Sequence, residues 1–129
     1  MIPDSVQCIY PGAFSACESL SEVIIGDGVS SIAPDVFRWS ACYDNPNNWG
    51  NGALYIGNHL IKVSEDVEHF VVRPGTKSIV SNAFEGCYKL KHLTIGGEHR
   101  SVLGDYLTNL ETLVITEMPE RVYRYFHMA

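Results

Sequence analysis

Apolar residues recur along this chain at a fixed spacing. Residues 2–25 and 72–95 align at an offset of 70, and the alignment places identical residues at six apolar positions: Ile9/Ile79, Ala13/Ala83, Phe14/Phe84, Cys17/Cys87, Leu20/Leu90 and Ile25/Ile95. A shift of 23 carries Val6, Ile9 and Phe14 onto Val29, Ile32 and Phe37. The spacing therefore predicts a repeat with a period of 23, and the offset of 70 is about three such periods.

Each unit predicts a strand, a turn and a short helix. The pattern apolar-x-x-apolar-x-apolar, typical of a strand, occurs four times, and its last copy arrives three residues early: 20–25, 67–72, 90–95 and 110–115. Turn formers such as Pro74, Gly75 and Thr76 follow the strand segments. Apolar residues at i, i+1, i+4 and i+7 from Ala13 predict one face of a short helix, and Ser81 and Asn82 are placed as N-caps of its later copy.

Residues 39–63 interrupt the repeat. Turn formers crowd 44–52, and residues 53–63 predict two short strands around a Gly57-Asn58 hairpin turn. One coil of the repeat is therefore expected to be replaced or decorated by a β-hairpin.

A unit this short cannot bury an apolar face alone, so its copies must stack. The prediction is an α/β fold: a right-handed solenoid with parallel strands, short helical turns and the inserted hairpin. We expect a single domain over 1–129 with four to five coils, forming part of a longer array. Ile2 is the register equivalent of Ile25, and Val122 continues the register of Ile9 and Ile32. A weak or truncated cap is expected over 116–129, and exposed solenoid ends favour end-to-end self-association of the isolated segment.

The repeat resembles the BspA-like leucine-rich repeats of bacterial surface proteins, whose unit runs I-P-x-x-V-x-x-I-x-x-x-A-F-x-x-C-x-x-L-x-x-V-x-I. The first copy matches at Ile2, Pro3, Val6, Ile9, Ala13, Phe14, Cys17, Leu20, Val23 and Ile25. The segment from Trp49 to Lys62 is also similar to a module that interrupts repeats in that family. Departures lie at 96–99, in the shortened fourth coil and in the tail 118–129. The resemblance implies a surface-exposed or secreted protein used in adhesion and in binding macromolecules of a host or neighbouring cell.

Charge and composition exclude several classes of protein. Nine basic and fifteen acidic residues give a net charge of -6, which is the wrong sign for binding nucleic acid or an anionic membrane. No apolar stretch is long enough to span a bilayer, and the first residues lack the features of a secretion signal, so membrane insertion is not expected.

The four cysteines show neither a C-x-x-C pair nor zinc-finger spacing. Cys17 and Cys87 occupy the same core position in coils that are not adjacent, so both are expected to be buried free thiols. Cys8 and Cys42 are less constrained, and a disulfide between them remains an alternative.

Side chains at the outward positions of the strands form a surface that takes no part in the hydrophobic core. Three rows are expected across the coils: Ile24, Val71, Thr94 and Val114; Ser21, Glu68, Lys91 and Glu111; and Glu22, His69, His92 and Thr112. The alternation of charge in the second row favours pairing between strands. The apolar row predicts a protein-binding stripe, or else β-branched residues that simply suit a sheet surface.

Histidines and aromatic residues leave further alternatives open. His69 and His92 should be neighbours, and with Glu22 or Glu68 they could hold a transition metal, although solvated histidines are commoner and we predict no resident metal or cofactor. Aromatic residues in and beside the insert are expected to pack it against the solenoid, or else to stack on sugar rings: Trp39, Tyr43, Trp49 and Tyr55. In the tail, Tyr123, Tyr125 and Phe126 are expected to form a cap or to begin a further coil.

Sequence signatures of enzymes are lacking: there is no G-x-S-x-G, H-E-x-x-H or phosphate-binding loop, and no pair of carboxylates is forced to face each other. We therefore predict a non-enzymatic binding or adhesion module at the cell surface or outside the cell. Its expected ligand is a protein or glycoprotein, including one derived from a host. The alternatives are a structural spacer and a carbohydrate-binding module.

Overall fold

The computed structural model describes residues 1–102 and 107–116, and the side chains of all of these except 100–102. The register expected for Val122 and the aromatic tail residues Tyr123, Tyr125 and Phe126 lie outside the described residues. So does nearly all of the cap expected over 116–129.

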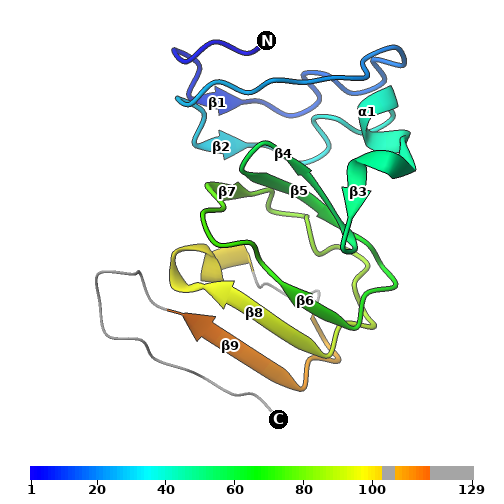
Figure 1. Cartoon of the computed structure of the whole chain (residues 1–129), viewed down its shortest axis with the longest axis vertical. Helices are drawn as coiled ribbons and strands as arrows, with labels where there is room; N and C mark the ends of the chain where they lie inside the picture. The colour runs from blue at the N-terminus through cyan, green and yellow to red at the C-terminus, as the bar shows by residue number, and fades with distance from the viewer. Residues whose placement is uncertain (103–106, 117–129) are drawn as a thin grey trace.

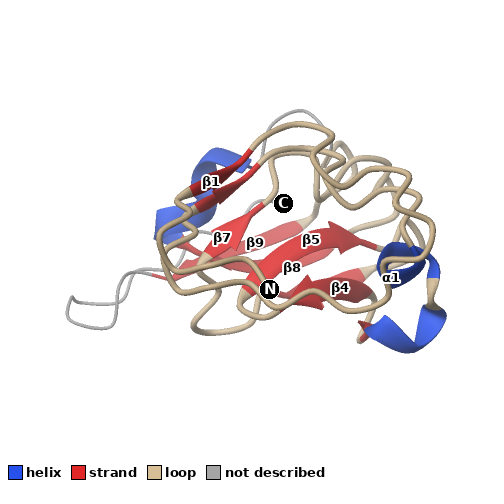
Figure 2. Ribbon diagram, turned by 90° about the horizontal axis from the view of Figure 1, so that it is seen from above, coloured by secondary structure: helices blue, strands red, loops and turns tan. Residues whose placement is uncertain are grey.

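The chain winds into a solenoid of about five turns with parallel strands. Figure 1 shows the coils stacked along the long axis of the molecule, with the N-terminus at one end and the last strand at the other. Seen from above, successive coils lie over one another (Figure 2). The predicted solenoid with parallel strands and an inserted hairpin is thus confirmed.

Described strands form three sheets. The first pairs β1 (Cys8–Ile9) with β2 (Ser31–Ile32) in parallel. The second has the order β3-β4-β5-β7, formed by β3 (Trp49–Gly50), β4 (Ala53–Ile56), β5 (His59–Val63) and β7 (Ser78–Ile79). The third is fully parallel, in the order β6-β8-β9, and is formed by β6 (His69–Val71), β8 (His92–Gly96) and β9 (Thr112–Thr116).

Strand register follows the repeat. Cys8 pairs with Ser31 and His69 with His92, and the partners of each pair are one period apart. His92 pairs with Thr112, which lies short of a full period because the last strand arrives early, as predicted. Ile2 and Ile25 form an isolated parallel bridge, which confirms their register as well.

Hydrogen bonds also join residues one period apart. The Ser30 hydroxyl donates to the Gln7 carbonyl oxygen at 3.4 Å, and the Asp27 amide donates to the Asp4 carboxylate at 2.9 Å. His99 Nε2 lies 2.8 Å from the carbonyl oxygen of Thr76. Adjacent coils are therefore connected by side chains as well as by strand pairing.

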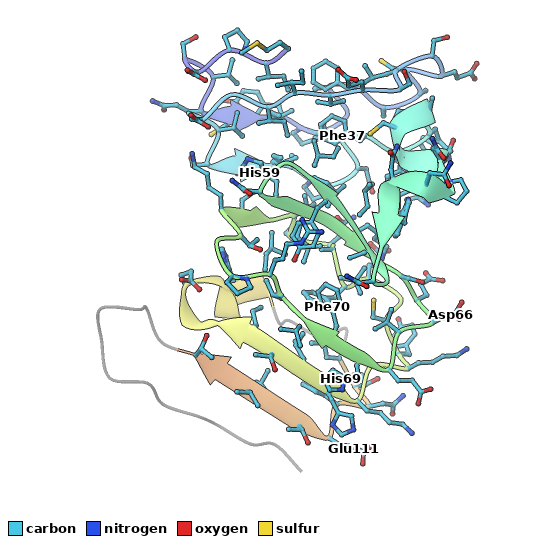
Figure 3. All side chains as sticks on the ribbon, in the orientation of Figure 1. Phe37, His59, Asp66, His69, Phe70 and Glu111 are labelled. Carbon is cyan, nitrogen blue, oxygen red and sulfur yellow. The ribbon has the colours of Figure 1, made fainter. Side chains whose placement is uncertain are left out.

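One hydrophobic core runs through the stack. Buried side chains from the coils and the insert belong to a single cluster, in which Phe37, Phe84 and Leu93 are at most 1% exposed. Phe14 stacks on Phe37 with ring centroids 5.8 Å apart, and Phe70 meets Phe84 edge-on at 6.2 Å. Figure 3 shows Phe37 and Phe70 pointing into the interior from coils at different heights. The coils share an interior, as the stacking argument requires.

Short helices predicted at Ala13–Leu20 and after Ser81 and Asn82 do not form, and turns take their place. The backbone gives the reason: Ala16, Trp39 and Gly86, which are equivalent positions of the repeat, have φ of 59°, 64° and 83°. A left-handed residue at this point ends any right-handed helical turn, so the apolar spacing is satisfied by tight turns instead. Helical structure in the described residues is confined to α1 (Ala41–Asp44) and two 3-10 segments, η1 (Pro46–Asn48) and η2 (Gly97–Val102).

The insert forms the predicted hairpin. β4 and β5 are antiparallel, and Gly57 in the turn between them has a φ of 58°, which suits a two-residue hairpin loop. Before the hairpin, α1 and η1 occupy the place where a strand of the second coil would lie. Ser40 begins α1, and its hydroxyl accepts a hydrogen bond from the Tyr43 amide at 3.2 Å.

All four cysteines are free thiols, so the alternative of a disulfide between Cys8 and Cys42 is not realised. Cys87 is buried as predicted, and burial raises its pKa; burial likewise raises the pKa of Cys42. The prediction for Cys17 is wrong, because its side chain is exposed. In the structure coil 1 has a neighbouring coil on one side only, so nothing there covers the position that buries Cys87 deeper in the stack.

Candidate binding face

The outer surface of the β6-β8-β9 sheet carries two rows of side chains. His69, His92 and Thr112 are direct partners across the strands, and so are Val71, Thr94 and Val114. We call these six residues the strand face. Between the rows, Phe70, Leu93 and Leu113 point inward and are buried, so strand alternation fixes which side chains face outward.

The second row is an apolar stripe open to solvent. Val71 is 52% exposed, and Thr94 and Val114 are half-buried beside it. All three are β-branched, and their neighbours in the first row are two exposed imidazoles with ring centroids 5.7 Å apart. The strand face thus combines apolar contact area with polar groups at its edge.

Charged residues border the first row. The Lys91 ammonium lies 3.7 Å from the Glu68 carboxylate, so the predicted pairing between these strands is confirmed. Glu111 continues the row through its backbone, since its amide donates to the Lys91 carbonyl oxygen at 2.8 Å. Figure 3 shows His69 and Glu111 at the same corner of the sheet.

Ser21, Glu22 and Ile24 do not lie on this sheet, which corrects the expectation that they begin its three rows. The segment 20–25 forms no continuous strand and contributes one bridge, from Ile25 to Ile2. The cause is the insert, because α1 and η1 stand where a strand of the second coil would connect coil 1 to β6. Ile24 is 53% exposed but isolated from the strand face.

A pocket of about 580 Å³ opens at the carboxyl ends of the same strands. Val71, Thr94, Thr116 and Arg73 are among the residues that line it. The Arg73 guanidinium lies 3.9 Å from the centre of the Tyr55 ring, and the Arg73 amide donates to the Tyr55 hydroxyl at 3.0 Å. Two contacts therefore fix the arginine at the pocket.

Aromatic residues of the insert make internal contacts. Tyr43 and Trp49 meet edge-to-face at 5.5 Å, and the Trp49 indole donates to the Tyr43 carbonyl oxygen at 2.8 Å. Tyr55 holds Arg73 as described. Trp39 differs, because it is 58% exposed, and the Arg38 guanidinium lies 4.9 Å from the centre of its ring.

A buried His–Ser contact lies on the other side of the insert. His59 Nδ1 is 2.6 Å from the Ser78 hydroxyl, and the two side chains are 4% and 8% exposed. Burial lowers the pKa of His59, and the charge of Lys77 lowers it further. Neither residue was singled out from the sequence, because a lone histidine after a turn carries no recognisable signal. The distance suits a nucleophile and its base, but burial denies a substrate access to the pair.

Groups of three or more histidine, cysteine or acidic side chains arranged to hold a metal ion are absent from residues 1–102 and 107–116. In the same part of the chain, no helix has the length and apolar character needed to cross a membrane.

Comparison with known proteins identifies the repeat. A family model described as the BspA type leucine rich repeat region matches residues 1–114 in six copies, two more than the four strand segments visible in the sequence. No curated protein and no solved structure matches the chain. Leucine-rich-repeat solenoids of this kind are generally non-enzymatic, and the family suggests surface or secreted proteins. The match covers most of the length of the chain and agrees with the solenoid fold. The chain therefore belongs to the BspA-type leucine-rich-repeat family.

Proposed function

We propose that this chain is a non-enzymatic module that binds a protein ligand through the strand face, at the surface of a cell or outside it. The observation that carries the proposal is the outward-facing row of Val71, Thr94 and Val114, in which Val71 is exposed and the other two are half-buried, and which stands beside polar and charged residues. Buried residues of a repeat hold the stack together, whereas the outward rows are free to differ from one protein to another.

A protein ligand suits this surface better than a sugar does. The row forms a shallow surface of β-branched side chains that continues over three strands. Such a surface, with polar groups at its edge, is typical of a protein-binding patch. A sugar site would need an exposed aromatic platform, and Tyr43, Trp49 and Tyr55 are instead engaged in contacts within the molecule. The carbohydrate alternative would therefore rest on Trp39 alone among the insert aromatics.

Binding can be tested with the purified chain immobilised as bait for extracellular matrix and cell-surface proteins. The variant Val71→Asp/Val114→Asp places two charges on the row, and we expect loss of the captured ligand. Ile24→Asp is the matched control, because Ile24 is as exposed as Val71 but lies off the sheet.

The outcomes separate the alternatives. Loss of capture by the double variant, with normal capture by Ile24→Asp, supports the strand face. Equal capture by the parent chain, the double variant and Ile24→Asp would place the contact outside the strand face. A chain that captures nothing, and that can be replaced in its parent protein by unrelated repeats of equal length, would be a spacer. Saturable binding on a glycan array that is lost in Trp39→Ala would favour the carbohydrate alternative.

A further inference from the structure

The two histidines of the strand face stand in a defined geometry. His69 begins β6, His92 begins β8, and they are direct partners in the parallel register. Both side chains are exposed, and their ring centroids are 5.7 Å apart with 48° between the ring planes. Two imidazoles that ligate one ion through nitrogen at about 2.1 Å place their centroids about 5 to 6 Å apart, so the observed separation suits a shared ion.

Backbone pairing fixes the strands that carry the two rings. The His92 amide donates to the Glu68 carbonyl oxygen at 3.1 Å, which ties β8 to the residue just before His69. Both histidines are held on paired strands. Once one imidazole has bound an ion, the other imidazole is therefore present near that ion at a high effective concentration.

Charges around the pair do not oppose a cation. Lys91, the residue before β8, is paired with Glu68, and Glu111 lies at the same corner of the sheet. Thr112 is the third member of the row, so among the described strands no further imidazole continues it. A third protein ligand is not found among the described residues, and water would fill the remaining coordination positions.

We propose that His69 and His92 form a two-imidazole site for a divalent transition ion of the copper, nickel and zinc class. Neutral imidazole is a good ligand for these ions, whereas magnesium and calcium require oxygen ligands that the pair does not offer. The open coordination positions point away from the sheet, where a ligand atom from a bound molecule could replace water. This site is independent of the proposed protein-binding function, because ion binding can be measured without a partner.

Titration of the full chain with Ni²⁺ tests the site by calorimetry. The background is Cys8→Ser/Cys17→Ser, which removes the two exposed thiols that also bind soft ions. We expect one ion per chain and tighter binding of Cu²⁺ than of Ni²⁺. His69→Ala and His92→Ala should each weaken Ni²⁺ binding about 100-fold, since each removes the chelate.

His99→Ala is the matched control, because it removes a histidine that lies outside the row and contacts the Thr76 carbonyl oxygen. It should leave Ni²⁺ affinity unchanged. Circular dichroism of each variant without metal shows whether the fold is intact, and loss of the histidine ring NMR signals of His69 and His92 on adding Cu²⁺ reports the site directly. Equal affinity in the parent and in either alanine variant would overturn the proposal, as would the absence of saturation below about 1 mM Ni²⁺.

Discussion

Coil 1, residues 2–25, and the coils that supply β6, β8 and β9 carry the same repeat but have different neighbours. In the C-terminal coils three consecutive strands pair over three to five residues. Coil 1 offers the same apolar pattern, yet its segment 20–25 makes only the bridge at Ile25. Phe14 is half-buried where its equivalents Phe37 and Phe84 are almost fully buried. The contrast teaches that the repeat supplies a surface for stacking, and that the adjacent coil decides whether a strand forms and a side chain is buried.

The largest effect expected from this contrast comes from truncating equivalent core residues. Phe84→Ala should lower the free energy of unfolding by about 3–5 kcal/mol, because it leaves a cavity in the core. Phe14→Ala, at the same repeat position in coil 1, should cost about half as much since its ring is already partly solvated. Urea denaturation of the two variants measures the difference, and equal losses would show that coil 1 is packed as tightly as the rest.

A glycine substitution tests how closely coil 1 lies on its neighbour. A Cβ on Gly28 would overlap the carbonyl oxygen of Asp4, so Gly28→Ala should force the two coils apart and destabilise the protein by about 1–3 kcal/mol. Gly50→Ala is the control, because no atom lies within 4 Å of the added Cβ, and it should change stability by less than about 0.5 kcal/mol. Thermal unfolding of both variants gives the comparison.

Lowering the pH should destabilise the protein through His59 in the β4-β5 hairpin, which lies between coil 1 and the coils of β6, β8 and β9. His59 stays neutral in the folded protein because burial lowers its pKa, whereas in the unfolded chain it takes up a proton below its ordinary pKa of about 6.5. The unfolded state then binds more protons, so stability falls as the pH drops below about 6.5 towards the lowered pKa.

The His59→Asn variant isolates this effect from the titration of carboxylates. Its free energy of unfolding, measured in urea between pH 5 and 8, should change less with pH than that of the parent. Parallel pH curves for the two proteins would refute a neutral buried histidine.

The smallest effect is expected at the edge of the strand face. Glu68→Gln removes the exposed ion pair with Lys91 and should cost at most about 1 kcal/mol, a loss that disappears in high salt. Glu111→Gln serves as its control, because no ion pair of Glu111 is found within the described residues. A larger loss for Glu68→Gln that persists in salt would mean that the residue supports the sheet in another way.

Much of the fold follows from the spacing of apolar residues. The period of 23, the early arrival of the last strand and the turn at Gly57-Asn58 are all present in the structure, because each depends on contacts between equivalent positions or on local turn chemistry. The cross-strand register of His69, His92 and Thr112 follows from the same spacing.

Two kinds of feature could not be predicted from the pattern. The spacing that begins at Ala13 fits a helix, but backbone geometry at Ala16 and Gly86 replaces it with turns, and apolar spacing does not report φ. The exposure of Cys17 depends on coil 1 having a neighbouring coil on one side only, and the place of Ile24 depends on the insert. Similarly, the contact of His59 with Ser78 arises only when β5 pairs with β7.

The left-handed position of the turn has a consequence for how such a repeat can vary. Alanine, tryptophan and glycine all occupy it, at Ala16, Trp39 and Gly86, so the conformation is imposed by the winding of the coil and not by the residue. At Ala16 the amide donates across to the carbonyl oxygen of Arg38 at 2.9 Å, which holds the turn from outside. Trp39 projects from the flank and is 58% exposed, whereas a Cβ added at Gly86 would overlap the Glu65 carboxylate. The side chain that a coil can present at this position therefore depends on the space its neighbours leave: the flank can change at Trp39 without redesign of the interior, while at Gly86 a neighbouring side chain would first have to move.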